Sequence, residues 1–231
     1  VHGRASVLVV GGVSSGKTTT LRAMGMEHRP HVRIITIEDV DELGLHRFGR
    51  LHVVAEEARL TGGLRQGDAD VTVYDLMVNA LRQRPDLIYV GEAREGRTLK
   101  VLLEAMVSGH PGSGGTLHVD RPADLVPRVS IMICPEFPNF KREDVLDLLA
   151  QAVRLVIFQY RLPTGERKVM RIAEVRGVRR GGLDFNVLFR YDPFRQRHVR
   201  EGAISEDLAE HFYLNGVSEE EMALFREAVR E

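Results

Sequence analysis

Residues 11–18 carry the residue types and the spacing of a phosphate-binding loop. They read GGVSSGKT, which fits the pattern G-x-x-x-x-G-K-[ST]. Glycine permits backbone conformations that other residues avoid, so successive N–H groups can point inward at an anion. The Lys17 ammonium would reach the terminal phosphates of a nucleotide, and the Thr18 hydroxyl would bind Mg²⁺. The predicted nucleotide-binding residues are Gly11, Gly12, Val13, Ser14, Ser15, Gly16, Lys17, Thr18 and Thr19.

Acidic residues follow two apolar strand-like runs, where a nucleotide-hydrolysing enzyme needs them. Such an enzyme orders Mg²⁺ or the attacking water with an acid near the γ-phosphate, and α/β ligand sites lie at the carboxyl ends of strands. Glu92 follows the run at residues 87–90 and is predicted to polarise the water. Glu38 and Asp39 end a second strand in the same way. The alternative for each is a surface acid or a helix cap.

His118 is a third candidate for contact with the γ-phosphate. It lies in a short strand-like run at residues 116–119, after a glycine-rich loop at residues 109–115. A histidine there could sense the phosphate, although a lone histidine is more often structural.

Short apolar runs alternate with helical patterns through the first half of the chain. Strands are predicted at residues 6–10, 33–38, 51–55, 87–90 and 116–119, and helices at residues 18–24, 71–84 and 99–107. Residues 61–70 are predicted to be a loop. This alternation predicts an α/β fold in which a largely parallel sheet carries helices on both faces.

The pattern changes after residue 121. Helical patterns at residues 122–133 and 141–152 precede strand-like runs at residues 154–162, 167–178 and 183–191, which predict an antiparallel meander. Helices are predicted at residues 205–214 and 218–230, the second with a capping box of Ser218 and Glu221. We therefore expect a core over residues 1–153, and residues 154–231 as part of the same domain or as a subdomain.

Composition excludes several classes of protein. The net charge of −1 gives no whole-chain reason to expect nucleic acid or an anionic membrane as a partner, although a local basic patch stays open. A single cysteine, Cys134, excludes an internal disulfide and a cysteine-based zinc site. No apolar run reaches the ~18 residues of a membrane span. These features agree with a protein of the reducing cytosol.

Four segments with distinctive residues stand in a fixed order along the chain. They are GGVSSGKTT at residues 11–19, RIITIEDVDEL at 33–43, NALRQRPDLIYVGEARE at 79–95 and SGHPGSGGTLHVDRPAD at 108–124. They resemble the Walker A loop, Asp box, atypical Walker B motif and His box of the type II and type IV secretion ATPases, which include type IV pilus motors. The forms TIED-x-x-EL and NALR-x-RPD-x-I-x-VGE-x-R are most similar to the branch with Tad (Flp) pilus and conjugative type IV secretion ATPases.

The resemblance implies a RecA-like P-loop ATPase core that binds ATP or ADP with Mg²⁺. It assigns phosphate and Mg²⁺ binding to Lys17 and Thr18, a place near the γ-phosphate and the metal to Glu38, catalysis to Glu92, and the His-box positions to His110 and His118, with His118 nearer the nucleotide. It also suggests that Arg94 carries the nucleotide state to a neighbouring subunit, the alternative being a solvated arginine.

Three departures from the family pattern limit these assignments. The His box usually continues T-L-H-A-N-S, whereas this chain has Val119, Asp120 and Arg121 after the histidine. Ser14 stands where glycine is frequent in the Walker A loop. Family members also have an N-terminal domain that covers the nucleotide and supplies arginines. We expect this domain to be absent from the chain as given.

The implied function is that of an ATP-hydrolysing motor of a type IV secretion or Tad/type IV pilus assembly system. The resemblance implies a hexameric ring that works with an inner-membrane platform protein, lies in the cytoplasm at the inner face of the membrane and moves pilin or another substrate. Direct nucleic-acid binding is not predicted. Alternatives are a conjugative DNA or protein export ATPase, a phosphotransferase, and a domain that binds nucleotide without turnover alone. Loop arginines that could act across subunits, or simply be solvated, are Arg47, Arg50, Arg59 and Arg65.

Overall fold

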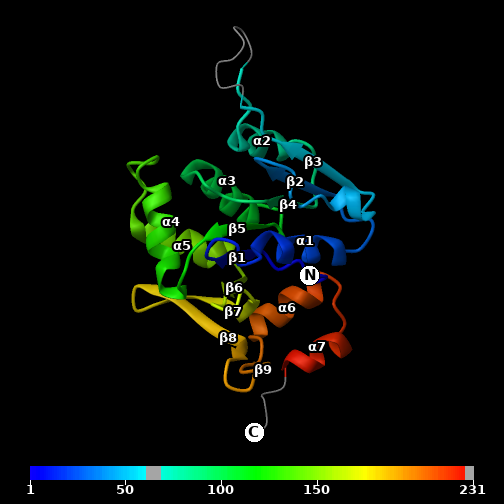
Figure 1. The fold of residues 1–231 in the computed structure, drawn as a ribbon, viewed down its shortest axis with the longest axis vertical. Coiled ribbons are helices and arrows are strands. Elements are labelled where there is room, and N and C mark those ends of the chain that lie inside the picture. Colours follow the sequence, from blue (N-terminus) through cyan, green and yellow to red (C-terminus); the bar gives the residue numbers. More distant parts are fainter. Residues whose placement is uncertain (61–68, 227–231) are drawn as a thin grey trace.

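The computed structural model describes residues 1–60 and 69–226, and Figure 1 shows their fold. Within these residues, nine strands form a single sheet in the order β3-β2-β4-β5-β1-β6-β7-β8-β9. Strands β1 to β6 pair in parallel, and β7, β8 and β9 continue the sheet in antiparallel pairs. The strands are β1 (Val7–Gly11), β2 (Ile34–Glu38), β3 (Val53–Glu57), β4 (Leu87–Val90), β5 (Gly114–His118), β6 (Leu155–Arg161), β7 (Arg167–Arg179), β8 (Gly182–Asp192) and β9 (Arg197–Arg200).

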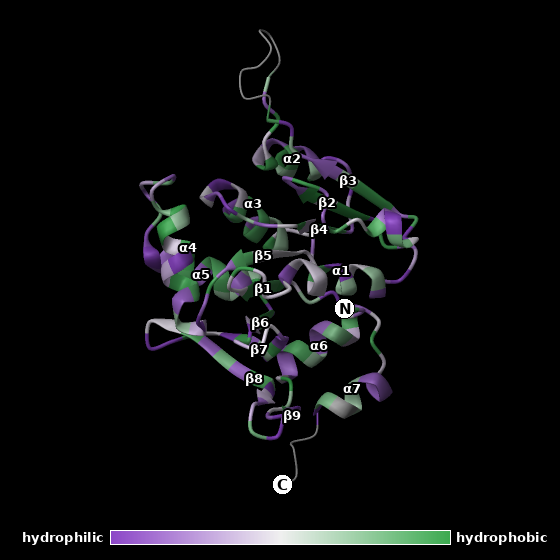
Figure 2. Ribbon diagram, in the orientation of Figure 1, coloured by the Kyte–Doolittle hydropathy of each residue, from purple (hydrophilic) through white to green (hydrophobic). Residues whose placement is uncertain are grey.

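Helices cover both faces of this sheet, which confirms the predicted α/β fold. On one face, Leu8 and Val10 of β1 pack in a core with α2, α3, α4 and α5, and on the other face Val7 and Val9 pack with Leu21 of α1. Consecutive strand residues point to opposite faces, so both faces of β1 are buried. Figure 2 shows the hydrophobic segments concentrated on the central strands. The helices are α1 (Lys17–Glu27), α2 (Val73–Ala80), α3 (Gly96–Val107), α4 (Leu125–Ile133), α5 (Arg142–Ala152), α6 (Glu206–Leu214) and α7 (Glu219–Arg226).

The helix predicted over residues 71–84 is shorter in the structure. Thr72 is the N-cap of α2, and its side chain accepts a hydrogen bond from the backbone N–H of Asp75. The helix ends at Ala80. Arg84 has a φ of 54°, and this residue precedes a proline, a position that avoids the helical region.

The helix predicted at residues 99–107 begins earlier, at Gly96. The carboxylate of Glu136 accepts hydrogen bonds from the backbone N–H groups of Gly96 and Arg97, at 2.8 and 3.0 Å. This cap comes from a distant segment, so no local pattern announces it. Two strands also start away from their predicted positions: β3 begins after the predicted residue 51, and β5 begins inside the predicted glycine loop.

The C-terminal part contains the predicted meander, and its first strand also belongs to the parallel sheet. Strand β6 pairs in parallel with β1 and antiparallel with β7. The sequence did not predict β9, which is short and polar. The capping box of Ser218 and Glu221 starts α7 as predicted. The last residues of the helix predicted at 218–230 lie outside the described residues, as do most of the loop at 61–70 and Arg65.

The described residues include no helix with both the length and the apolar composition needed to cross a bilayer.

Candidate nucleotide-binding site

A cavity of about 540 Å³ lies over the carboxyl ends of β1, β4 and β5. These ends lie together because the strands are parallel and adjacent, with Gly11 of β1 opposite His118 of β5. The sequence-predicted residues that line the cavity are Val13, Ser14, Ser15, Gly16, Lys17, Thr18, Thr19, Glu92, Arg94 and His118. The structure therefore brings the Walker A, Walker B and His-box residues to one place.

The phosphate loop owes its shape to backbone conformations that favour glycine. Gly16 has a φ of 96° and Ser14 a φ of 57°, so the position where the family often has glycine is left-handed here. A Cβ atom on Gly11 would lie 2.4 Å from the backbone oxygen of Gln159. Helix α1 follows at once, and its N-cap residue, Gly16, makes no side-chain capping hydrogen bond. Its free N–H groups are therefore available to an anion.

Lys17 is buried and held inside the loop. Its ammonium donates hydrogen bonds to the carbonyl oxygens of Gly11 and Gly12, at 3.1 and 2.9 Å. Burial lowers the pKa of Lys17, while the negative charges of Glu92 and Asp120 oppose that shift. The ammonium remains the positive centre of the cavity, which suits the phosphates of a nucleotide.

His118 connects this lysine to the strand-end acid. Its Nδ1 lies 3.4 Å from Nζ of Lys17, and its Nε2 lies 2.8 Å from Oε1 of Glu92. Both contacts fit a neutral ring that carries its proton on Nε2, with Nδ1 accepting from the ammonium and Nε2 donating to the carboxylate. Burial, and then the charge of Lys17, hold the pKa of His118 below its ordinary value.

Arg94 holds the other oxygen of Glu92. Its Nε and Nη2 donate to Oε2 at 3.0 and 2.8 Å, and its Nη1 lies 3.0 Å from Oδ2 of Asp39. Glu92 therefore has one oxygen on His118 and one on Arg94, and Asp39 joins the cluster through the arginine. The predicted acid is held in a defined orientation at the edge of the cavity.

Glu38 lies near this cluster but does not line the cavity. Its side chain is buried, with both oxygens accepting hydrogen bonds from the backbone N–H of Leu43 at 3.0 and 3.1 Å. Burial raises the pKa of Glu38 to about 7. Gly91 makes room for it, since a Cβ atom there would lie 2.6 Å from the Glu38 side chain. The predicted contact of Glu38 with Mg²⁺ stays a prediction.

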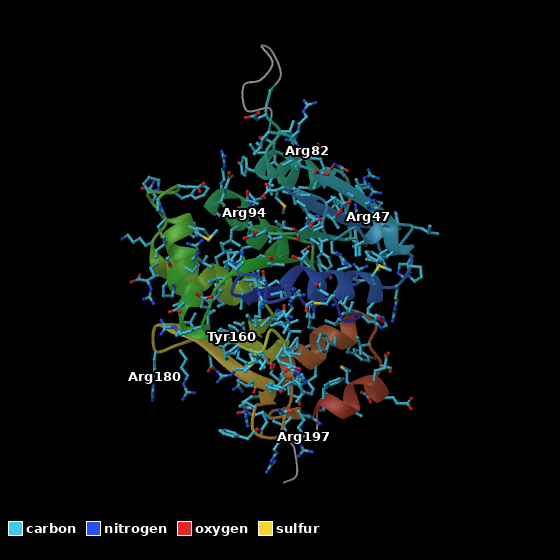
Figure 3. All side chains as sticks on the ribbon, in the orientation of Figure 1. Arg47, Arg82, Arg94, Tyr160, Arg180 and Arg197 are labelled. Carbon is cyan, nitrogen blue, oxygen red and sulfur yellow. The ribbon has the colours of Figure 1, made fainter. Side chains whose placement is uncertain are left out.

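The structure places three further candidates away from the cavity. His110 precedes β5, whose first residue pairs with Val7 at the start of β1, so it lies at the opposite edge of the sheet. Arg50 is not a solvated loop residue, since it is buried and donates to the carbonyl oxygens of His28, Arg29 and Val32. Arg47 is exposed and pairs with Asp41. In Figure 3, Arg47 lies at the right of the molecule, whereas Arg94 lies near α3.

Sequence reasoning missed two residues of the C-terminal part that contact the loop and α1. Arg167, the first residue of β7, lines the cavity and donates from Nε to the carbonyl oxygen of Ser14 at 3.0 Å. Gln159 of β6 donates to the Thr20 hydroxyl at 2.7 Å. Neither lies in a recognisable motif. They reach the loop and α1 because β6 pairs with β1 and β7 pairs with β6.

Known proteins share part of this sequence. A protein of Mycobacterium tuberculosis named for conjugal transfer is 35% identical over 176 residues, which is 76% of this chain and 48% of that protein. Protein VirB11 of Agrobacterium fabrum is 34% identical over 68% of this chain and 44% of its own length. The chain thus spans about half the length of these relatives.

Two solved structures of secretion ATPases resemble this fold. The VirB11 ATPase of the Brucella suis type IV secretion system superposes with a TM-score of 0.63 and 26% identity, over 74% of this chain and 48% of that one. The ATPase DotB of Legionella pneumophila superposes with a TM-score of 0.54 and 26% identity, over 71% of this chain and 43% of that one. The family model described as "Type II/IV secretion system protein" matches residues 1–175, and the chain therefore belongs to this family.

Proposed function

We propose that this chain binds MgATP in the cavity and hydrolyses it by attack of water on the γ-phosphate. The observation that carries the proposal is the hydrogen-bonded series from Lys17 through His118 to Glu92. It joins the lysine that would hold the phosphates to the acid that would polarise the water. A surface glutamate with a purely structural role has no reason to be coupled to the phosphate loop in this way.

The loop would bind the β- and γ-phosphates through the N–H groups at the start of α1 and through Lys17. The Lys17 ammonium now donates to the carbonyls of Gly11 and Gly12. Ionised phosphate oxygens are stronger acceptors than neutral carbonyls, so the ammonium would transfer its hydrogen bonds to them. His118 would then lose its contact with Lys17, which would report the presence of the phosphate to Glu92.

Glu92 would act on the attacking water. Its carboxylate is already oriented by His118 and Arg94. A carboxylate in that position would accept a proton from the water and align it with the γ-phosphate.

Mg²⁺ fits this site as an ion held mainly by the nucleotide. Among residues 1–60 and 69–226, no group of three His, Cys, Asp or Glu side chains could hold a metal alone. Mg²⁺ in such enzymes is bound by phosphate oxygens, waters and one or two protein oxygens. Thr18 lines the cavity and would supply one of them; Glu38 would have to give up its bonds to Leu43 to supply another. The ion would neutralise charge that develops on the phosphates.

We further propose that the hydrolysis drives transport in a type IV secretion or Tad/type IV pilus system. Support comes from membership of the family and from the names of relatives, which refer to conjugal transfer and type IV secretion. The proposed assembly is a hexameric ring at the inner face of the membrane, in contact with an inner-membrane platform protein. A conjugative DNA or protein export ATPase is the nearest alternative, and capture of membrane partners distinguishes the two.

Steady-state phosphate release from MgATP, measured over a range of protein concentrations, tests the proposal. We expect a rate that rises more than linearly with protein, that is lost in Lys17→Ala, and that falls at least about 100-fold in Glu92→Gln. Glu95→Gln is the matched control, because Glu95 is an exposed acid on the same loop that pairs with Arg97. Nucleotide binding without any turnover would instead identify the chain as a binding domain only.

A further inference from the structure

Arg167 reaches the phosphate loop from the C-terminal part of the chain. It begins β7, directly after the turn that follows β6, and its Nε donates to the carbonyl oxygen of Ser14 at 3.0 Å. Its methylene groups cover Gly16, since a Cβ atom placed on that glycine would lie 3.3 Å from Cδ of Arg167. The side chain therefore contacts both left-handed residues of the loop from outside.

The contact with the Ser14 carbonyl fixes the direction of the next N–H group. The chain has no cis peptide among the described residues, and in a trans peptide the C=O and the following N–H point in opposite directions. With the Ser14 oxygen turned toward Arg167, the N–H of Ser15 faces the interior of the loop. There it makes a long hydrogen bond of 3.4 Å to the carbonyl oxygen of Gly12. A phosphate oxygen inside the loop would be a better acceptor.

Ser14 needs such support more than glycine would. Its φ of 57° lies in the left-handed region, which costs a residue with a Cβ atom roughly 1–2 kcal/mol. An external hydrogen bond to its carbonyl offsets part of that cost. Glycine adopts the same conformation freely, so a glycine at this position would depend less on Arg167.

The guanidinium also contributes charge to the cavity. Its Nη groups have no hydrogen bond or ion pair with any residue in the described ranges, although the side chain lines the cavity. The neighbouring acid, Glu166, pairs instead with Lys168 at 3.6 Å. A positive charge without an acidic partner remains at the rim of the phosphate site, where it would attract a nucleotide.

We propose that Arg167 is a positioning residue for nucleotide binding. It holds the peptide between Ser14 and Ser15 so that its N–H faces the phosphates, and so links the C-terminal meander to the phosphate loop. This inference rests on the proposed function, because it concerns the same nucleotide site. The sequence shows no site in residues 154–200. Through Arg167, this segment would take a direct part in nucleotide binding.

Nucleotide affinity and turnover of Arg167 variants test the inference. Binding of a fluorescent ADP and steady-state hydrolysis are measured for the wild-type chain, Arg167→Ala and Arg167→Lys. We expect Arg167→Ala to raise Kd and KM about tenfold with kcat within about threefold, because the contact serves binding rather than the chemical step. Arg167→Lys keeps the charge but not the planar donor, so its Kd should lie between those of the wild-type and alanine proteins. Arg171→Ala is the control, because Arg171 is an exposed arginine of the same strand. We expect its Kd to equal that of the wild type.

Ser14→Gly separates positioning from charge. If Arg167 acts through the Ser14 peptide, Arg167→Ala should cost less than about threefold in Kd when Ser14 is already glycine. A tenfold loss in both backgrounds would overturn the positioning role, and an unchanged Kd in Arg167→Ala would overturn any role. Thermal unfolding of each variant confirms that it is folded. A wild-type chain that binds no nucleotide would refute the proposed function itself, a result distinct from a failure of Arg167 alone.

Discussion

Nε2 of His118, the last residue of β5, lies 2.8 Å from Oε1 of Glu92, which follows the adjacent parallel strand β4. Strands β4 and β5 end side by side, so a histidine at the end of one and a glutamate just beyond the other meet without any local sequence relationship. The same ring contacts Lys17 from its Nδ1 side. One imidazole therefore touches both the phosphate-binding and the proposed water-polarising group.

Replacing His118 should impair turnover more than binding. In His118→Ala, Glu92 loses one of its two side-chain partners and keeps Arg94, so the carboxylate is less well oriented. We expect kcat to fall at least about tenfold while Kd for ADP changes less than about threefold. His52→Ala, an exposed histidine before β3, is the control. A large loss of ADP affinity with unchanged kcat would show that His118 serves the loop and not Glu92.

The pH dependence of turnover should reflect a neutral His118. Burial and the charge of Lys17 lower the pKa of His118 below its usual value. The neutral ring, whose Nδ1 accepts from Lys17, is then present at pH 7. As the pH falls through the lowered pKa, Nδ1 gains a proton, so the ring loses this acceptor and places a second positive charge beside the ammonium. We expect kcat to have no inflection from this group between about pH 6.5 and 8, and an acid limb below about pH 6.5 that is absent in His118→Ala.

Glu38 should make folding stability depend on pH. Its pKa in the folded chain is about 7, above the usual value of 4.5. The folded state then binds more protons than the unfolded state between these values, so this carboxyl makes the fold less stable as the pH rises from about 4.5 to 7. Glu38→Gln lacks this titration. Its stability relative to the wild type should therefore increase by about 3 kcal/mol across that interval.

Urea unfolding at several pH values measures this difference. Glu57→Gln, an exposed acid at the end of β3, is the matched control and should show no trend relative to the wild type. A constant difference between Glu38→Gln and the wild type over the same pH interval would mean that folding does not shift the pKa of Glu38.

The first half of the fold follows from local sequence signals. Buried parallel strands read as continuous apolar runs, so β1, β2 and β4 lie within one residue of their predicted places. The phosphate loop, Glu92 and His118 stand at the carboxyl ends of such strands. Since parallel strands bring these ends together, the sequence alone was enough to predict that these residues meet.

The rest depends on contacts between distant segments. Glu136 caps α3 from forty residues away in the chain, and Arg167 contacts Ser14 across 153 residues. Neither contact has a local signature. Glu38 differs, since its partner is local: the single backbone N–H of Leu43, five residues away, is shared between both oxygens of the buried carboxylate.

Gly11 should tolerate no side chain. A Cβ atom there would lie 2.4 Å from the backbone oxygen of Gln159, which belongs to the adjacent strand and cannot move freely. We expect Gly11→Ala to lower the free energy of unfolding by about 2 kcal/mol and to weaken ADP binding, since the loop begins at this residue. Gly182→Ala is the control, because the nearest atom to its Cβ lies 4.0 Å away. Equal stability of the two variants would show that β1 and β6 can separate at little cost.

Arg94 should matter for turnover and hardly for stability. Its side chain is 65% exposed in its pairs with Asp39 and Glu92, and exposed ion pairs contribute about 0–1 kcal/mol. We therefore expect Arg94→Ala to change the free energy of unfolding by less than about 1 kcal/mol. Glu92 would lose the partner of its second oxygen, so kcat should fall about three- to tenfold with ADP affinity unchanged. In Arg94→Lys, the ammonium can still neutralise the charge of Glu92. It lacks the planar guanidinium, whose several N–H groups bind Glu92 and Asp39 at the same time. Full activity of the lysine variant would show that only the charge of Arg94 is required, and full activity of the alanine variant would show that His118 alone orients Glu92.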